Sequence, residues 1–244
     1  MEHTDWFENW FGSPYYKILY QNRDVLEAQA FVDKLIHYLQ PLPLSSMLDI
    51  ACGEGRFAIQ LADYGYDVTG IDLSHQSIEK AKAYENDHLQ FFLHDMRFPF
   101  YINYFDYAFN FFTSFGYFAH NRDHVMAAKA FASALKKNGI LVIDYLNKEQ
   151  VLANMKAEDT VQRGSYTFRI TKKLERNHII KNIEFTDADN RKRNYTESVA
   201  AFTLADFIQM FKKAGLSLIS TFGDYHLNSY HPYESPRMIM IFKK

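Results

Sequence analysis

Cysteine is nearly absent from this sequence. The 244 residues include a single cysteine, Cys52. One cysteine cannot form a disulfide within the chain, and its isolation fits a reducing compartment. Cys52 precedes a glycine in a short turn, and we interpret it as a small residue that fits the loop rather than as a reactive thiol. We therefore expect a cytoplasmic protein.

The sequence also lacks a strong charge of either sign and a long apolar run. Its 27 lysines and arginines and 29 acidic residues give a formal net charge of -2. This balance provides no basic surface for nucleic acid. No stretch approaches the roughly 20 apolar residues of a membrane span. The start, MEHTDWFENWF, is acidic and aromatic, unlike a signal peptide. We expect neither nucleic acid nor membrane as a partner.

Apolar and aromatic residues are abundant by contrast. Hydrophobic residues make up 48% of the chain and charged residues 23%, as in ordinary globular proteins. The length suits one α/β domain with excursions and a substantial core. Aromatic residues reach 17%, with 22 phenylalanines and 17 tyrosines, which predicts aromatic-lined surfaces or pockets.

The most informative stretch covers residues 47–74 and reads MLDIACGEGRFAIQLADYGYDVTGIDLS. It predicts a strand that begins at Met47, a tight loop around Gly53, and a helix that begins near Phe57. A second short strand then ends on Asp72. In a doubly wound sheet such a loop lies at the carboxyl ends of the strands, beside the free N–H groups of a helix. An acid after the second strand is placed to accept hydrogen bonds from ribose. A ligand that carries a nucleoside is therefore the first hypothesis.

Two kinds of nucleoside ligand fit this motif. Residues 53–58, GEGRFA, satisfy the dinucleotide pattern G-x-G-x-x-[GA], although so short a pattern is weak evidence. Asp49 favours a different ligand, because a dinucleotide fold keeps the first strand apolar up to the first glycine. A carboxylate buried there needs a partner. The ammonium group of a methionine moiety supplies one.

With an acid, small residues and glycines in this arrangement, the chain resembles the class I S-adenosylmethionine-dependent methyltransferases. Ala51 is a departure, since many members have a glycine there. The resemblance extends over nearly the whole chain and implies a doubly wound, Rossmann-like sheet of seven strands in the order 3-2-1-4-5-7-6. It also implies S-adenosylmethionine as cofactor. The terminal strand, expected near residues 236–243 as an antiparallel hairpin with 216–222, distinguishes this fold from dinucleotide dehydrogenases.

The resemblance implies roles for several strand-end residues. Asp72 would hold the ribose and Asp95 the adenine amino group, with Leu73 and Met96 packed on the base. The loop after the fourth strand would lie beside the methyl group. An amino-terminal flap would close over the site with Tyr15, Tyr16, Tyr20 and Arg23 as its polar tips. The cofactor-binding set is Asp49, Ala51, Gly53, Gly55, Asp72, Leu73, Asp95, Met96, Asn110 and Tyr20. No residue is identified as the catalytic base, and no metal ligand is assigned.

The periodicity divides the chain into three regions. We expect a flap and helix at 1–40, a cofactor-binding α/β domain at 41–160 and 202–244, and an antiparallel β insertion over the active site at 161–201. The insertion is predicted from period-two alternation and should contain about three strands. Within the α/β domain, a helix over 123–135 should stop at residues 136–139 and be followed by a strand at 140–146. Ser74 and Thr203 are predicted helix caps.

Tyrosines in two segments suggest what kind of molecule accepts the methyl group. Tyr225, Tyr230 and Tyr233, with His226 and His231, occupy the connection before the terminal strand, and the flap adds its own three tyrosines. Tyrosine suits a pocket that excludes water and orients one small polar molecule. We therefore expect a small-molecule acceptor methylated on nitrogen or oxygen. The alternatives are a nicotinamide-dependent oxidoreductase and a protein that binds S-adenosylmethionine without turnover. The oligomeric state is not predicted.

Overall fold

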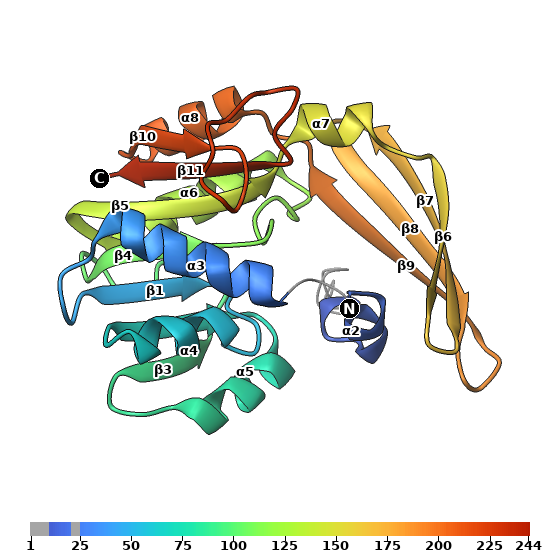
Figure 1. Cartoon of the computed structure of the whole chain (residues 1–244), viewed down its shortest axis with the longest axis horizontal. Coiled ribbons are helices and arrows are strands. Elements are labelled where there is room, and N and C mark those ends of the chain that lie inside the picture. The colour runs from blue at the N-terminus through green and yellow to red at the C-terminus, as the bar shows by residue number, and fades with distance from the viewer. Residues whose placement is uncertain (1–9, 21–24) are drawn as a thin grey trace.

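The chain forms two β-sheets joined side by side (Figure 1). The structure is a computed structural model and describes residues 10–20 and 25–244. The main sheet has seven strands in the order β10-β11-β5-β4-β1-β2-β3. Their bounds are β1 Ser46–Ile50, β2 Asp67–Asp72, β3 Leu89–Leu93, β4 Phe105–Asn110, β5 Leu135–Leu146, β10 Ser217–Phe222 and β11 Arg237–Lys243. The second sheet, called here the auxiliary sheet, contains β6 Glu158–Arg163, β7 Tyr166–Glu175, β8 His178–Thr186 and β9 Lys192–Ala200.

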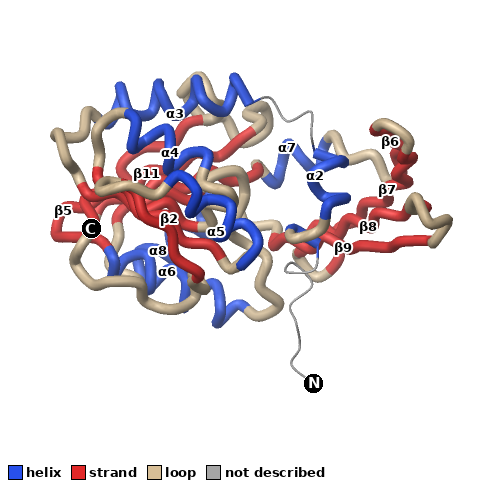
Figure 2. Tube along the Cα trace, turned by 90° about the horizontal axis from the view of Figure 1, so that it is seen from below, coloured by secondary structure: helices blue, strands red, loops and turns tan. Residues whose placement is uncertain are grey.

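Helices cover both faces of the main sheet, as Figure 2 shows. One face packs against α3 Val25–Leu39, α4 Arg56–Asp63 and α5 His75–Ala81, which the short 3-10 helix η1 Lys82–Tyr84 extends. The other face packs against α6 Asn121–Ala134 and α8 Leu204–Lys213. Buried residues alternate between the two faces along each strand, as Leu141 and Ile143 do on one side and Val142 on the other. The result is the predicted three-layer α/β architecture.

The strand order confirms the predicted fold class. Counted within the main sheet alone, the order is 3-2-1-4-5-7-6. Strands β1 to β5 pair in parallel, and β11 pairs antiparallel with both β5 and β10. The carboxyl ends of the parallel strands therefore share one edge of the sheet. This edge faces the auxiliary sheet and the short helix α2 Pro14–Tyr20 (Figure 1).

Both predicted helix caps are present. The Ser74 side chain accepts a hydrogen bond from the Ser77 amide at the start of α5. Thr203 and Asp206 form a reciprocal capping box at the start of α8. These local signals fix where two of the helices on opposite faces of the sheet begin.

The boundary between α6 and β5 differs from the prediction. The helix ends at Ala134, and residues 135–139 already belong to the strand rather than to a helix stop. Leu135 pairs with Phe105, and the Lys136 ammonium lies 2.8 Å from the Asp106 carboxylate. Pairing with β4 therefore extends the strand through a segment that reads locally as a basic helix end.

The auxiliary sheet confirms the antiparallel prediction but has four strands rather than about three. Its first strand, β6, was missed because its residues alternate only between exposed and half-buried positions. Register is continuous across the sheet, as in the pairing of Ile170 with Ile183. One face packs on the described amino-terminal residues through Trp10, Leu19, Phe168, Ile170, Ile183 and Phe185. Among the described residues, no helix is long and apolar enough to span a membrane.

A buried histidine lies where the auxiliary sheet joins the main domain. His124 of α6 is 2% exposed and is surrounded by Phe115, Phe118 and Phe202. Neither ring nitrogen has a hydrogen-bond partner among the residues that the structure describes. Burial lowers the pKa of His124 to about 4. This buried environment therefore favours the neutral form of the ring.

This arrangement predicts an acid-sensitive fold. The pKa of His124 in the folded chain lies below its ordinary value of 6.5, so the unfolded chain binds the proton more readily. The free energy of unfolding should therefore fall by about 1 kcal/mol per unit as pH drops from 6.5 toward 4. His124→Phe should remove this contribution. Denaturant melts of both proteins across that range measure the difference, and parallel profiles would contradict the prediction.

Candidate functional site

The loop between β1 and α4 contains three residues with left-handed backbone. Ala51, Gly53 and Gly55 have φ values of 62°, 58° and 84°. A Cβ added at Gly55 would lie 2.5 Å from the Phe91 ring, whereas one at Gly53 would meet no atom within 4 Å. Gly55 is thus required by packing beneath the loop. Gly53 leaves open space on the outer side, where a ligand can approach the backbone.

Asp49 lies directly below this loop, at the end of β1. Its side chain is 2% exposed, and its Oδ2 atom has no hydrogen-bond partner within residues 10–20 and 25–244. Burial raises the pKa of Asp49 to about 7, and the carboxylate of Asp72 adds to the rise. The amide of Ala58 and the guanidinium of Arg56 act in the opposite direction. Among the described residues, no side-chain cation forms an ion pair with this carboxylate, and its burial calls for one.

Asn110 provides a second buried acceptor on the neighbouring strand. Its Nδ2 atom donates to the Ile50 carbonyl at 3.0 Å, but its Oδ1 atom has no partner in the described part of the chain. Strands β1 and β4 are paired next to this point, with Asp49 opposite Phe109. Two unpaired oxygens at neighbouring strand ends suit a ligand group with several N–H donors.

Asp72 connects the second strand to the same loop. Its Oδ2 accepts from the Gly53 amide at 2.9 Å and its Oδ1 from the Ser74 amide at 2.7 Å. Burial raises its pKa despite these amides. Because each carboxylate oxygen has two acceptor positions, Asp72 keeps room for hydroxyl donors. The half-buried Leu73 follows it at the edge of the sheet.

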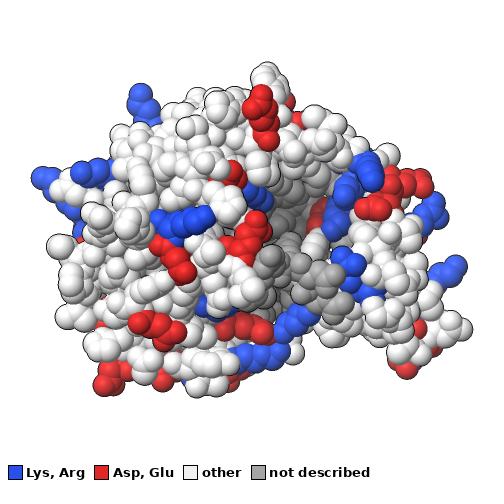
Figure 3. All heavy atoms as spheres, in the orientation of Figure 1, with Lys and Arg blue, Asp and Glu red and all other residues white. Residues whose placement is uncertain are grey.

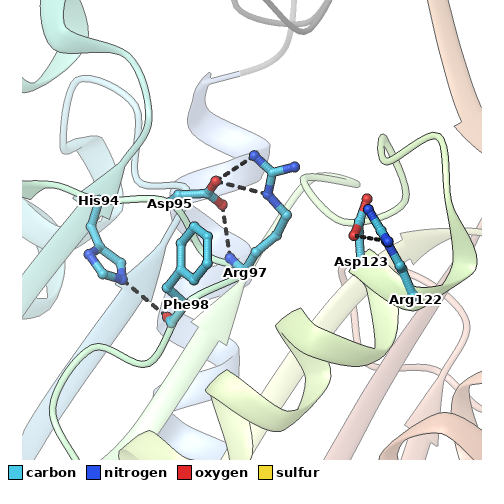
Figure 4. A network of polar contacts seen from close by, with 6 residues as sticks. All are labelled: His94, Asp95, Arg97, Phe98, Arg122 and Asp123. Atoms are coloured by element: carbon cyan, nitrogen blue, oxygen red, sulfur yellow. Dashed lines mark hydrogen bonds and ion pairs between the residues drawn. The ribbon is translucent and has the colours of Figure 1, made fainter. Parts of the chain in front are cut away.

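Asp95 follows β3 and is engaged within its own turn. Its carboxylate accepts from the Arg97 amide at 2.9 Å and from Nε and Nη2 of the same residue at 2.8 and 2.6 Å (Figure 4). The Arg97 guanidinium lies 5.3 Å from the centre of the Phe118 ring. Met96, the residue between Asp95 and Arg97 in the sequence, is half-buried and packs on the core. Asp95 thus also serves as the turn residue that its position suggests.

Residues 10–20, called the flap below, connect the cofactor-loop region to the auxiliary sheet. At one end, the Lys17 ammonium binds the carboxylate of Glu54, which Lys80 also contacts at 3.0 Å. Burial raises the pKa of Glu54, but the two ammonium groups outweigh this and lower it overall. Phe11 packs against Tyr117, 5.1 Å between ring centres. The flap therefore reaches the loops after both β1 and β4.

A polar cluster holds the flap on the auxiliary sheet. The Glu197 carboxylate of β9 accepts from the Trp10 indole and from the Tyr20 hydroxyl, each at 2.6 Å. Lys181 of β8 lies 3.5 Å from Glu197 and donates to the Tyr20 hydroxyl. The predicted flap residue Arg23 lies outside the described residues. Tyr20 is thus bound through its hydroxyl to the auxiliary sheet.

The six tyrosines of the predicted acceptor pocket lie in three separate places. Tyr15, Tyr16 and Tyr20 belong to the flap. Tyr225 lies against Phe31 and donates to Asp144. Tyr230 and Tyr233 line a separate pocket of about 230 Å³ with the starts of α7 Lys148–Ala153 and α8. These hydroxyls do not converge on one pocket, because the connection after β10 wraps around the edge of the main sheet.

The histidines near these tyrosines lie outside the cluster of strand ends. His226 lies 2.6 Å from Lys34 on the outside of α3. The His231 amide donates to Ser235 within the connection itself. His120 is exposed at the start of α6. None of the three is brought beside Asp49 or Asn110.

The strand ends face the flap and the auxiliary sheet (Figure 1). Figure 3 shows a hollow between the main domain and the auxiliary sheet, with basic and acidic side chains mixed along its margins. The sequence patterns did not identify four charged residues that hold these segments together, Asp144, Lys181, Glu197 and Arg237. Their charges lie on strands that appeared to be ordinary sheet segments.

With this strand order, the fold is that of the S-adenosylmethionine-dependent methyltransferases. The chain belongs to the family described as "Methyltransferase domain", which matches residues 24–221. S-adenosylmethionine is its cofactor, and the nicotinamide-dependent alternative is not supported.

Two curated relatives share about a quarter of their residues with this chain. The putative methyltransferase YqeM of Bacillus subtilis is 26% identical over 191 residues, 73% of this chain and 76% of the relative. The glycine/sarcosine N-methyltransferase of Parasynechococcus marenigrum is 25% identical over 218 residues, 84% of this chain and 74% of the relative.

Two solved structures have the same fold. An S-adenosylmethionine-dependent methyltransferase from Clostridium acetobutylicum superposes with a TM-score of 0.78 at 16% identity, covering 96% of this chain and 98% of that one. The sugar N-methyltransferase KedS8 from Streptoalloteichus gives 0.72 at 20% identity, covering 94% and 92%.

Proposed function

We propose that this enzyme methylates a nitrogen or oxygen atom of a small molecule in the hollow between the main domain and the auxiliary sheet. One observation carries the cofactor part of the proposal. Asp49 Oδ2 and Asn110 Oδ1 are buried without a hydrogen-bond partner among the described residues. They lie on paired strands, below an open glycine loop. A methionine ammonium group has the donors that both oxygens lack.

The other predicted cofactor residues receive roles that fit their surroundings. Ala51, Gly53 and Gly55 shape the loop, and Gly53 faces the methionine moiety. Asp72 accepts from the ribose hydroxyls. Leu73 and Met96 pack on adenine, and Asp95 accepts from its amino group with the acceptor position that Arg97 leaves free. Tyr20 contributes its ring, because its hydroxyl is held by Glu197.

The cofactor supplies an activated methyl group when bound. The chain's own task is then to hold the acceptor in line and to keep water out. The flap is suited to this task because it contacts the loops after β1 and β4 as well as the auxiliary sheet. We therefore assign the flap and the 161–201 insertion the role of covering the acceptor. No general base is assigned.

Two relatives' names favour a small amine as acceptor. One is named a glycine/sarcosine N-methyltransferase and the other a sugar N-methyltransferase. The hollow in Figure 3 also presents both signs of charge rather than a continuous basic groove on the face shown. A small nitrogen nucleophile is accordingly the first class to test, with hydroxyl compounds second.

A product assay tests this proposal. The enzyme is incubated with S-adenosylmethionine carrying a trideuterated methyl group and a panel of amino acids, amino sugars, phenols and short peptides. Mass spectrometry should find the label on nitrogen or oxygen of a small compound. Label only in peptide or nucleic acid from an added cell extract would overturn the small-molecule assignment.

Matched tyrosine variants locate the acceptor. Tyr16 packs with Phe11 and Tyr20 in the flap, so Tyr16→Leu should lower turnover by about tenfold or more through poorer positioning. Tyr230→Leu alters the separate pocket beside α8 and should leave turnover near the native value. Initial rates at saturating cofactor measure both. The opposite ranking would move the acceptor site to the Tyr230 pocket.

A change at Asp72 tests the ribose role. Asp72→Ala should weaken S-adenosylhomocysteine binding by about 1.5–3 kcal/mol, the range for hydrogen bonds to a charged group. Asp72→Asn should lose less, because its amide oxygen still accepts from one backbone amide of the loop. Calorimetry gives both affinities. Native affinity in Asp72→Ala would remove this residue from the cofactor site.

A further inference from the structure

A buried carboxylate on β5 organises the loop that follows β4. Asp144 is 0% exposed. Its Oδ2 accepts from the Phe112 amide at 2.8 Å, and its backbone carbonyl accepts from the Thr113 amide at 3.0 Å. One residue of β5 therefore binds two consecutive amides of the neighbouring loop.

Those two loop residues are held in an unfavourable conformation. Phe112 and Thr113 have φ values of 56° and 62°, in the left-handed region that is unfavourable for a residue with a Cβ. Such strain persists only where surrounding contacts determine the backbone, and it is concentrated at functional sites. The two bonds from Asp144 are contacts of that kind.

Arg237, at the start of β11, binds both Asp144 and the loop after β4. Its Nε and Nη2 atoms lie 2.8 and 2.7 Å from Asp144 Oδ1, and Nη2 also donates to the Thr113 hydroxyl at 2.9 Å. The Tyr225 hydroxyl adds a bond to Asp144 at 3.1 Å. Four segments meet here, namely β5, the loop after β4, the start of β11 and the connection before it.

The loop held in this way borders the candidate cofactor site. Asn110, whose Oδ1 has no partner among the described residues, lies two residues before Phe112. The Phe112 ring stacks on Phe57 of α4 with 4.8 Å between ring centres. Further along the loop, Tyr117 contacts Phe11 of the flap. Displacement of the strained residues would therefore reach both the cofactor side and the flap.

We propose that Asp144 and Arg237 are positioning residues, which hold the loop at 111–113 in the shape that the methyl-transfer site requires. This inference rests on the proposed function. A buried ion pair is weak evidence for stability alone, since apolar residues of similar volume often do as well. A carboxylate in this place has a different advantage, because it accepts directional bonds from the Phe112 amide, Arg237 and Tyr225 together.

The experiment compares Asp144→Asn and Arg237→Met with a control, Asp106→Asn. Asp106 also pairs with a cation and a backbone amide, but at the amino end of β4. Each protein is examined by thermal melting, by hydrogen exchange of the Phe112 and Thr113 amides, and by calorimetry with S-adenosylhomocysteine. Arg237→Lys serves as the conservative variant.

Both test variants should exchange the two loop amides at least about tenfold faster and bind S-adenosylhomocysteine several-fold more weakly, while the chain remains folded. Arg237→Lys should recover part of the affinity, and the control should match the native protein in both readouts. Native affinity or native amide exchange in folded Asp144→Asn would overturn the positioning role. Absence of S-adenosylhomocysteine binding by the native protein would instead overturn the cofactor-site proposal on which this one rests.

Discussion

Asp49→Asn is expected to weaken S-adenosylhomocysteine binding by about 100-fold or more. Asp49 is buried, and the ligand's ammonium group is the cation that we propose to pair with it. Removing one partner of a buried ion pair costs about 3–5 kcal/mol, because the other charge stays desolvated and unpaired. Asparagine keeps the size of the side chain, so the loss of affinity reports on charge.

The same substitution should not destabilise the empty protein. The pKa of Asp49 in the folded chain is about 7, above its ordinary value of 3.8, so ionisation of this carboxylate opposes folding as pH rises through that range. Asparagine removes this cost. At pH 8 the variant should therefore melt at or above the native temperature while binding the ligand poorly. A variant that melts far below the native protein would indicate a structural role instead.

The native protein should also show a pH-dependent affinity that the variant lacks. Below pH 7, Asp49 must release a proton before it can pair with the ammonium group, so affinity should rise by up to about tenfold per unit as pH approaches 7 and then level off. Calorimetry in buffers of different ionisation enthalpy measures the proton released. If the affinity of Asp49→Asn changed with pH as steeply as that of the native protein, the pH dependence would come from titration of the ligand rather than of Asp49.

Local patterns located the first strands of the main sheet but not their order. Apolar runs with an acid at or near their end, namely Asp49, Asp72 and Asp95, located three successive strands, and period-two alternation located the auxiliary sheet. The order of the strands came from the resemblance rather than from these patterns, because pairing partners lie far apart in sequence. The same reason explains the error at residues 136–139, where pairing with β4 overrides a local helix-end signal.

The charged residues that shape the site were not predictable from one sequence. Asp144 and Arg237 are 93 residues apart and meet only because β5 and β11 pair. Glu197 on a polar strand reads as a solvent-exposed residue until the flap is placed over it. Tyr225 was predicted near the acceptor, but its hydroxyl is bound by Asp144. Long-range packing, rather than residue type, decides which of these groups belong to the site.

Alanine should affect different properties at the two glycines of the loop. Gly55→Ala should mainly reduce stability, and Gly53→Ala should mainly reduce ligand affinity. An added Cβ at Gly55 would lie 2.5 Å from the Phe91 ring and 3.3 Å from Ala81 Cβ. Overpacking of this kind costs about 1–3 kcal/mol, and the positive φ adds about 1–2. Gly55→Ala should therefore lower the free energy of unfolding substantially, and Phe91→Leu in the same chain should restore part of it.

Gly53→Ala should instead destabilise the fold only modestly and impair the ligand site. Its added Cβ meets no protein atom within 4 Å, so the fold bears only the backbone strain at a φ of +58°. Gly65 is a matched control, since it has a φ of +86°, equally open space and a position at the end of α4 away from the loop. Both variants should lose about 1 kcal/mol of stability. Only Gly53→Ala should lose S-adenosylhomocysteine affinity, by about tenfold or more, because the ligand occupies the space that the methyl group enters. Equal affinities in the two variants would show that the open side of Gly53 is not the side on which the cofactor binds.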